Sequence, residues 1–232
     1  MTSERISVSV SKGFFDAYLS LPPEGEGPGI LLIQEIFGVN EHIRSVADRL
    51  AAEGYVVLAP DLFWRMKPNI ELGYDDKDFA KALEYMRLFN EAEGLDDLKH
   101  AANDLRNHSA CTGRIGALGF CLGGKLTYRL ASHTNLNVAV AYYGVDIDKF
   151  LQESDKIKCS IMMHFAAEDK FVPPTAFNKI KEGLAEKPNF ELHLYEGVDH
   201  GFNCDVRDSY NKEAADLAWD RSLELFAREL KK

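Results

Sequence analysis

Short, continuously apolar segments alternate with amphipathic stretches along most of the chain. The apolar segments cover residues 29–33, 55–59, 115–120, 138–143, 160–165 and 190–195. Uniformly apolar runs of this length predict strands that are buried on both faces, as in a parallel sheet. Helical periodicity lies between them, over residues 41–53, 76–89, 95–108, 122–132, 174–186 and 210–230. This sustained alternation predicts an α/β fold, a doubly wound and mostly parallel sheet with helices on both faces.

The first 21 residues show a different pattern. Polar and apolar residues alternate over 6–10 and 14–21, which predicts two antiparallel strands at an edge of the sheet with one solvated face. We find no repeat and no linker that would divide the chain, so we predict a single domain over residues 1–232. The longest irregular piece, 62–75, carries Trp64 and other aromatic residues. It is a candidate lid or pocket wall, and equally a surface loop with packed aromatics.

Composition excludes several classes of protein. The net charge of -10, spread over mixed acidic and basic residues, argues against a nucleic-acid partner. The four cysteines form no CxxC pair, so neither a metal site nor a redox dithiol is indicated. The N-terminus lacks the apolar core of a signal peptide, and no uncharged apolar stretch reaches membrane-spanning length. We therefore expect a protein of the reducing cytoplasm, with no cofactor and no membrane association. A monomer is the default expectation, because the sequence shows no heptad seam and no symmetric patch.

The most informative segment is RIGALGFCLGGKLTYRL, at residues 114–130. A strand pattern meets a helical pattern at Cys121, within the sequence Gly-x-Cys-x-Gly that is typical of a nucleophile elbow. Glycines two residues before and after the cysteine fit such a turn, because side chains there would collide with the backbone. The start of the helix favours a thiolate, and the N–H of Leu122 is placed to stabilise an oxyanion. The pattern therefore predicts Cys121 as a nucleophile.

Two other interpretations of this segment compete with the nucleophile elbow. A buried cysteine in a glycine-rich turn occurs often by chance. The residues from Gly119 to Lys125 also match the phosphate-binding pattern G-x-x-x-x-G-K, but Leu126 stands where that motif needs a Ser or Thr to bind magnesium.

An elbow of this kind predicts an acid and then a histidine further along the chain. Asp169 follows the apolar segment 160–165, and His200 follows 190–195. Carboxyl ends of parallel strands share one edge of a sheet, where sites on such folds lie. Glu168 and Asp199 are competing acids, and we rank Asp169 first because Asp199 directly precedes the histidine. The sequence thus predicts a triad of Cys121, Asp169 and His200.

Several motifs together resemble the dienelactone hydrolase family. They are QEIFG at residues 34–38, PDLFWR at 60–65, GFCLGG at 119–124, YYG at 142–144, DKFVP at 169–173 and HGF at 200–202. The resemblance extends nearly end to end. It implies an α/β-hydrolase fold with a sheet of eight strands and a triad of Cys121, Asp169 and His200.

The resemblance also implies roles for further residues. Glu35 matches the glutamate of the family that contacts the resting thiol and helps to form the thiolate, although ion pairing at the sheet edge is an alternative for it. Ile36 would supply a second oxyanion N–H beside that of Leu122. Tyr142 would line the pocket, and Phe37 and Trp64 are further candidates for its wall.

The chain departs from the family at two positions. Arginines hold the substrate carboxylate in well-known members, whereas Phe79 and Cys204 stand at the matching positions here. Arg207 is a candidate replacement, pairing with Glu35 or with a substrate anion. The expected reaction is hydrolysis of a small ester or lactone through an acyl-thioester. Alternatives are the same chemistry on a neutral lactone or small carboxylic ester, or a non-catalytic, redox-sensing relative with a reactive cysteine.

Overall fold

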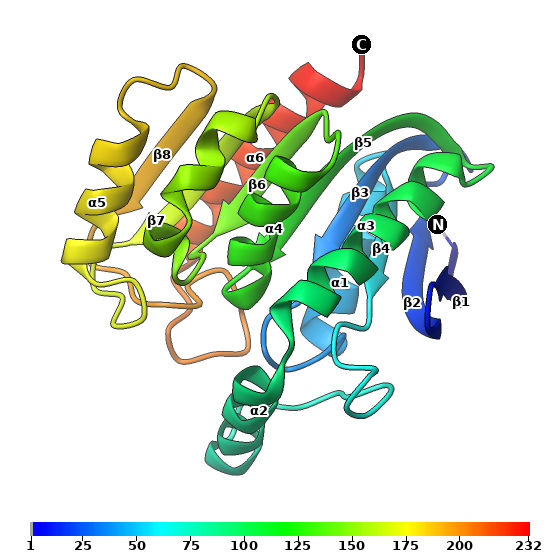
Figure 1. Ribbon diagram of the computed structural model, residues 1–232, viewed down its shortest axis with the longest axis horizontal. Helices are drawn as coiled ribbons and strands as arrows, with labels where there is room; N and C mark the ends of the chain where they lie inside the picture. The colour runs from blue at the N-terminus through cyan, green and yellow to red at the C-terminus, as the bar shows by residue number, and fades with distance from the viewer. Residues whose placement is uncertain (1) are drawn as a thin grey trace. The chain divides into compact units, whose positions relative to one another are not determined.

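The computed structural model describes residues 2–232 and has eight strands in the order β1-β2-β4-β3-β5-β6-β7-β8 (Figure 1). The strand pairs β3–β4, β5–β6, β6–β7 and β7–β8 are parallel, so the predicted mostly parallel α/β sheet is confirmed. The chain divides into two compact units, and the boundary along the chain falls between Ile115 and Gly116 in β5 (Cys111–Phe120). The single domain remains a prediction.

The first unit contains four complete strands and three helices. They are β1 (Thr2–Val10), β2 (Gly13–Leu21), β3 (Gly27–Ile33), α1 (Glu41–Ala52), β4 (Val56–Pro60), α2 (Asp76–Leu88) and α3 (Glu91–Asn107). The pair β1–β2 is antiparallel, as its alternating pattern predicts. Strands β3 and β4 are buried along their whole length, and both α1 and α3 pack against β4.

Helix α3 begins four residues before the position that periodicity predicts. Asn90 is the reason, because its side-chain oxygen accepts the N–H groups of Ala92 and Glu93 and so caps an earlier turn. The ring of Phe89 lies where a side chain on Gly94 would be, at 2.1 Å from an ideal Cβ. This first turn therefore packs through a glycine, which gives no apolar signal in the sequence.

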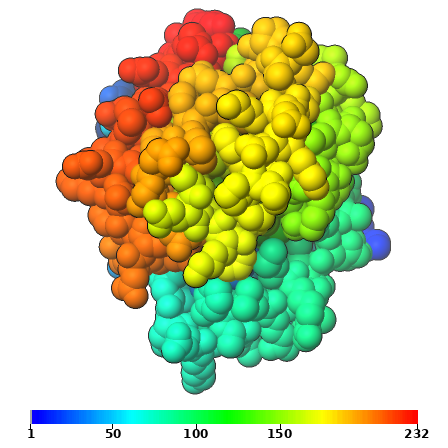
Figure 2. All heavy atoms as spheres, turned by 90° about the vertical axis from the view of Figure 1, so that its left-hand side faces the viewer, coloured from blue at the N-terminus to red at the C-terminus, as the bar shows by residue number. Residues whose placement is uncertain are grey.

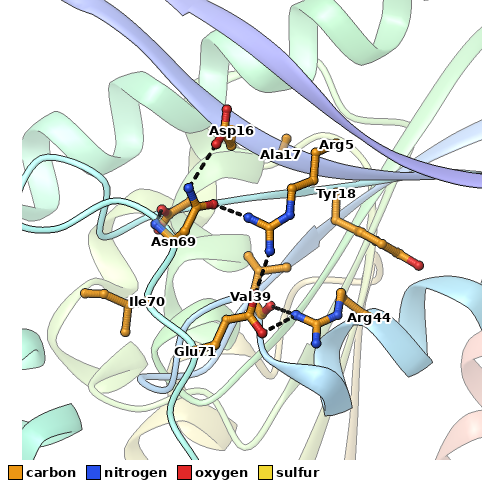
Figure 3. A pocket seen from close by; sticks show the side chains of 10 residues that line it. Arg5, Asp16, Ala17, Tyr18, Val39, Arg44, Asn69, Ile70 and Glu71 are labelled. Atoms are coloured by element: carbon orange, nitrogen blue, oxygen red, sulfur yellow. Dashed lines mark hydrogen bonds and ion pairs between the residues drawn. The ribbon is translucent and has the colours of Figure 1, made fainter.

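The segment between β4 and α2 is irregular, as predicted, and polar contacts hold it (Figure 3). The Asp61 carboxylate accepts the N–H of Phe63 at 2.9 Å and the N–H of Asn69 at 2.7 Å. Arg5 of β1 donates to the side chain of Asn69 and, at 2.6 Å, to Glu71. Burial raises the pKa of Asp61 to about 6.

The same loop is attached to the segment that follows β3. Glu71 forms a second ion pair with Arg44 of α1 at 2.7 Å and an isolated antiparallel bridge with Gly38. Gly38 has φ +82, and a Cβ there would lie 1.7 Å from the carbonyl oxygen of Ile70, so only glycine fits. The loop thus closes over the Gln34–Gly38 motif in the first unit.

The second unit begins with the end of β5. It continues with α4 (Leu122–His133), β6 (Val138–Tyr142), β7 (Ser160–Ala166), α5 (Pro174–Leu184), β8 (Phe190–Tyr195) and α6 (Lys212–Leu230). Figure 1 shows α4 in front of these strands and the red α6 behind them. Two 3-10 helices that the periodicity does not predict, Ile147–Lys149 and Leu151–Lys156, follow β6. In residues 2–232, no helix is both long and apolar enough to cross a membrane.

Candidate active site

Cys121 lies at the sharp turn between β5 and α4, where it is the N-cap of the helix. Its φ of 56° and ψ of -114° are unfavourable for a residue with a side chain. Its backbone is held on both sides: the N–H donates to the carbonyl of Tyr142 at 3.0 Å, and the carbonyl accepts from Lys125 and Val145. A Cβ on Gly119 would lie 2.2 Å from the carbonyl oxygen of Gly123, which explains the glycine at this point of the turn.

The backbone N–H groups at the start of α4 point toward Cys121, which directly precedes the helix. Leu122 is the first residue of the helix, so its N–H has no carbonyl one turn earlier to donate to. The positive end of the helix dipole stabilises negative charge at this point. These features suit both a thiolate and an oxyanion.

Asp169 and His200 are brought together from loops that follow β7 and β8. His200 Nδ1 lies 2.7 Å from Asp169 Oδ2, and the two residues are only 4% and 2% exposed. The other carboxylate oxygen accepts the N–H of Phe171 at 2.7 Å and of Val172 at 3.1 Å. The acid is therefore fixed in place, and it fixes the imidazole tautomer with the proton on Nδ1.

The opposite ring nitrogen of His200 is available for proton transfer. Nε2 is buried and has no hydrogen-bond partner of ordinary geometry among residues 2–232. Burial opposes the charged form of the ring, but the negative charge of Cys121 and the hydrogen bond to Asp169 raise the pKa of His200 to about 10. The raised pKa means that the imidazole accepts a proton readily beside Cys121.

The competing acids make other contacts. Asp199 accepts the backbone N–H of His200 at 2.6 Å, and Glu168 is exposed, with its own N–H bonded to the carbonyl of Val198. Among the three acids, Asp169 is the one that is hydrogen-bonded to the imidazole ring.

Two aromatic side chains flank the imidazole, and sequence reasoning missed both in this role. The ring centres of Tyr143 and Phe171 lie 4.9 Å and 4.8 Å from that of His200. Phe171 is 50% exposed. In Figure 2 its part of the chain, in yellow, adjoins the orange loop after β8 on the surface of the second unit. The motif DKFVP contains this phenylalanine two residues after the acid, and that spacing is the only sequence signal for it.

The predicted wall residue Tyr142 lies at the end of β6. Its side chain is fully buried, and its hydroxyl lies 2.8 Å from Ser222 Oγ of α6. Because Tyr142 is the last residue of β6, its side chain follows the alternation of the strand into the core, whereas Tyr143, at φ 38°, turns toward the imidazole. Arg207 packs against Gly201, where a Cβ would lie 2.4 Å from its guanidinium.

The remaining predicted residues lie in the first unit. Glu35 is 1% exposed and accepts from the hydroxyl of Tyr74 at 3.4 Å. Phe37 packs between Tyr74 and Phe79, with ring centres 4.6 Å and 6.1 Å away.

Trp64 is anchored rather than free to act as a lid. Its indole N–H donates to Asp97 of α3 at 2.9 Å, and its ring lies 5.8 Å from that of Phe15 in β2. The neighbouring Arg65 forms a two-point ion pair with the same carboxylate. A place for Trp64 in a pocket wall stays a prediction.

Comparison with known proteins identifies the family of the chain. The family model described as the dienelactone hydrolase family matches residues 15–230. The carboxymethylenebutenolidase of Pseudomonas sp. strain P51 is 35% identical over 230 residues, which is 98% of this chain and 96% of that protein. The chain belongs to the dienelactone hydrolase family.

Other members of the dienelactone hydrolase family give the same result. The carboxymethylenebutenolidase of Pseudomonas putida is 33% identical over 229 residues, covering 98% of this chain and 97% of that protein. The crystal structure of a candidate dienelactone hydrolase from Klebsiella pneumoniae covers 98% of both chains, with a TM-score of 0.86 and 30% identity. The chain is therefore a hydrolase that acts on ester or lactone bonds, with the fold expected from the resemblance.

Proposed function

We propose that this hydrolase cleaves a small ester or lactone through an acyl-thioester on Cys121, with His200 as base and Asp169 as its orienting acid. One observation carries the proposal: Asp169 fixes the ring of His200 through Nδ1, and Cys121 lies close enough to the same ring for its charge and its hydrogen bond to raise the pKa of the imidazole. A base held in this way beside a thiol at a helix start is the arrangement that activates a nucleophile.

The reaction proceeds in two balanced steps. Nε2 of His200 takes the thiol proton of Cys121, the thiolate adds to the carbonyl carbon, and the C–O bond breaks as Nε2 returns the proton to the leaving alkoxide. Water then adds to the thioester while Nε2 takes its proton, and the thiol leaves with that proton. In both steps the N–H groups of Leu122 and Ile36 are proposed to stabilise the oxyanion, and Glu35 to assist thiolate formation.

The substrate class is proposed from the relatives and from the residues around the base. Relatives named carboxymethylenebutenolidase favour a dienelactone-like substrate, and Arg207 beside Gly201 is proposed to bind its carboxylate. The exposed ring of Phe171 over the imidazole favours a second candidate, a neutral lactone or small carboxylic ester. Equal rates on an anionic and an uncharged lactone would exclude the role of Arg207.

Cellular setting and assembly belong to the same proposal. All four cysteines are free, which favours work in a reducing cytoplasm. Cys121, Asp169 and His200 come from one unit of one chain, so we propose that a monomer is active.

The deciding experiment replaces the nucleophile. Cys121→Ala should abolish turnover of small activated esters, because no other step forms the acyl intermediate. Wild-type protein incubated with the ester should carry the acyl mass on Cys121. Cys111→Ala, at a half-buried cysteine of the first unit, is the matched control and should keep full activity. Unchanged turnover in Cys121→Ala would refute the proposal, and alkylation of Cys121 without any turnover would favour the redox-sensing alternative.

A further inference from the structure

A buried hydrogen-bond network lies behind Cys121, between the strands of the second unit and α6. Its centre is Ser222 of α6, whose hydroxyl donates to the carbonyl of Ala218 at 2.7 Å. The same oxygen lies 2.8 Å from the hydroxyl of Tyr142 and 3.1 Å from Nε2 of His164. Tyr142 and His164 are fully buried and Ser222 is 1% exposed, so water does not compete for these contacts.

The hydrogens in this network have only one consistent arrangement. Ser222 has a single proton and gives it to Ala218, so the Tyr142 hydroxyl and His164 Nε2 must both donate to it. Burial lowers the pKa of His164 well below its usual value, so the ring is neutral and its Nδ1 accepts from Tyr195 at 2.9 Å. Arg221 of α6 donates in turn to the Tyr195 oxygen at 3.1 Å. Each donor in this chain has an acceptor.

The network is connected to both reacting groups through two adjacent residues. The carbonyl of Tyr142 accepts the N–H of Cys121 at 3.0 Å, and the carbonyl of His164 accepts the N–H of Tyr143 at 2.7 Å. The ring of Tyr143 then packs against His200. Cys121 and Tyr143 both have positive φ, a strained backbone that persists only when its surroundings hold it.

We infer that Ser222 is a positioning residue, which through Tyr142 and His164 sets the place of the Cys121 sulfur relative to the His200 ring. The inference rests on the proposed function, because it assigns Ser222 a part in preparing the same nucleophile. Ser222 touches neither substrate nor reacting atoms. Its effect passes through the Tyr142–Tyr143 backbone, which contacts the cysteine on one side and the imidazole on the other.

The test removes the central acceptor. Ser222→Ala leaves the Tyr142 O–H and the His164 N–H without their shared partner in a site that water does not reach. Alkylation of Cys121 by iodoacetamide, followed on the Cys121 peptide by mass spectrometry, should slow about tenfold, since small displacements of reacting groups have effects of this order or larger. Ester turnover should show the same fall in kcat with KM unchanged. Ser222→Thr, which keeps the hydroxyl, should recover most of both rates.

A matched control separates positioning from stability. Ser20 is also fully buried, and its hydroxyl donates to Asp48 at 2.7 Å in the first unit. Ser20→Ala should lower the melting temperature while both rates stay at the wild-type level. If Ser222→Ala fails to fold, Tyr142→Phe removes only one donor and should slow both rates in the same direction.

The rates of these variants decide whether Ser222 positions the nucleophile. Wild-type rates in folded Ser222→Ala or Tyr142→Phe would overturn the positioning role. Loss of rate in Ser20→Ala equal to that in Ser222→Ala would overturn it as well, because general destabilisation would then explain both. If the wild-type protein alkylates at Cys121 but hydrolyses no ester, the proposed function fails, while the alkylation rates still decide the role of Ser222.

Discussion

The two units contain clusters of similar side chains in different surroundings. In the first unit, Arg5 and Arg44 share Glu71, and these three side chains are 49%, 27% and 35% exposed (Figure 3). In the second unit, the side chains of Asp169 and His200 are 0% and 4% exposed. Water screens the charges of the first cluster, so they add little to stability. The second cluster is buried, and its hydrogen bonds therefore determine which atom carries the proton. The exposed cluster holds a loop in place, and the buried pair is a candidate for catalysis. The two differ more in burial than in residue type.

The strongest test of this comparison removes a charge from the buried pair. Asp169→Asn keeps an oxygen for the N–H groups of Phe171 and Val172 but cannot stabilise an imidazolium, so kcat for ester hydrolysis should fall about 10⁴-fold. Glu168→Gln, at the exposed neighbour, should change kcat by less than about twofold. Steady-state kinetics of both variants gives the answer, and Asp169→Asn with more than about a tenth of wild-type kcat would show that the buried pair is not the acid–base system.

Buried titratable groups in the two units should give opposite responses to acid. Asp61 has a pKa of about 6, above its unfolded value, so the folded first unit binds the extra proton and gains stability as pH falls from 6 toward 3.8. His164 has a folded pKa well below its unfolded value of 6.5, so the unfolded chain binds the extra proton and the second unit loses stability as pH falls below 6.5.

Two variants should separate these responses. Between pH 6 and pH 5 the free energy of unfolding should rise in the wild type relative to Asp61→Asn, and should fall in the wild type relative to His164→Gln. Each difference should be about 1 kcal/mol, somewhat less than the value of one full pKa unit, because each group is only partly titrated at pH 6. Urea titrations at the two pH values measure them. If this change in the free energy of unfolding is the same in the wild type and in Asp61→Asn, Asp61 does not titrate in this pH range. If it is the same in the wild type and in His164→Gln, His164 does not contribute to the pH dependence.

Much of the fold could be predicted because its signals are local. Apolar runs locate β3 to β8 within a few residues, and Gly119 marks the elbow because nothing larger fits beside Gly123. The order of Asp169 and His200 along the chain follows from parallel strands that end at one edge. The start of α3 was missed because a cap and a glycine, not an apolar stripe, define its first turn.

Contacts between distant segments could not be predicted. Tyr142 and Tyr143 look equivalent in the sequence. In the structure, the side chain of Tyr142 bonds to Ser222 and the ring of Tyr143 packs against His200. Ser222 lies 80 residues from Tyr142 and 58 from His164, so no local pattern connects them. Such networks form through packing of α6 on the strands, which a single sequence does not specify residue by residue.

The smallest effect is expected in the exposed cluster, and it completes the comparison. Glu71→Gln removes the charge that Arg5 and Arg44 share but keeps the shape of the side chain, so the free energy of unfolding should fall by at most about 1 kcal/mol. High salt should reduce the difference between wild type and variant further, because ions screen exposed charges. Urea titrations at low and high sodium chloride measure both effects. A loss of several kcal/mol that salt does not change would mean that this cluster behaves as a buried one, and the distinction between the two units would then fail.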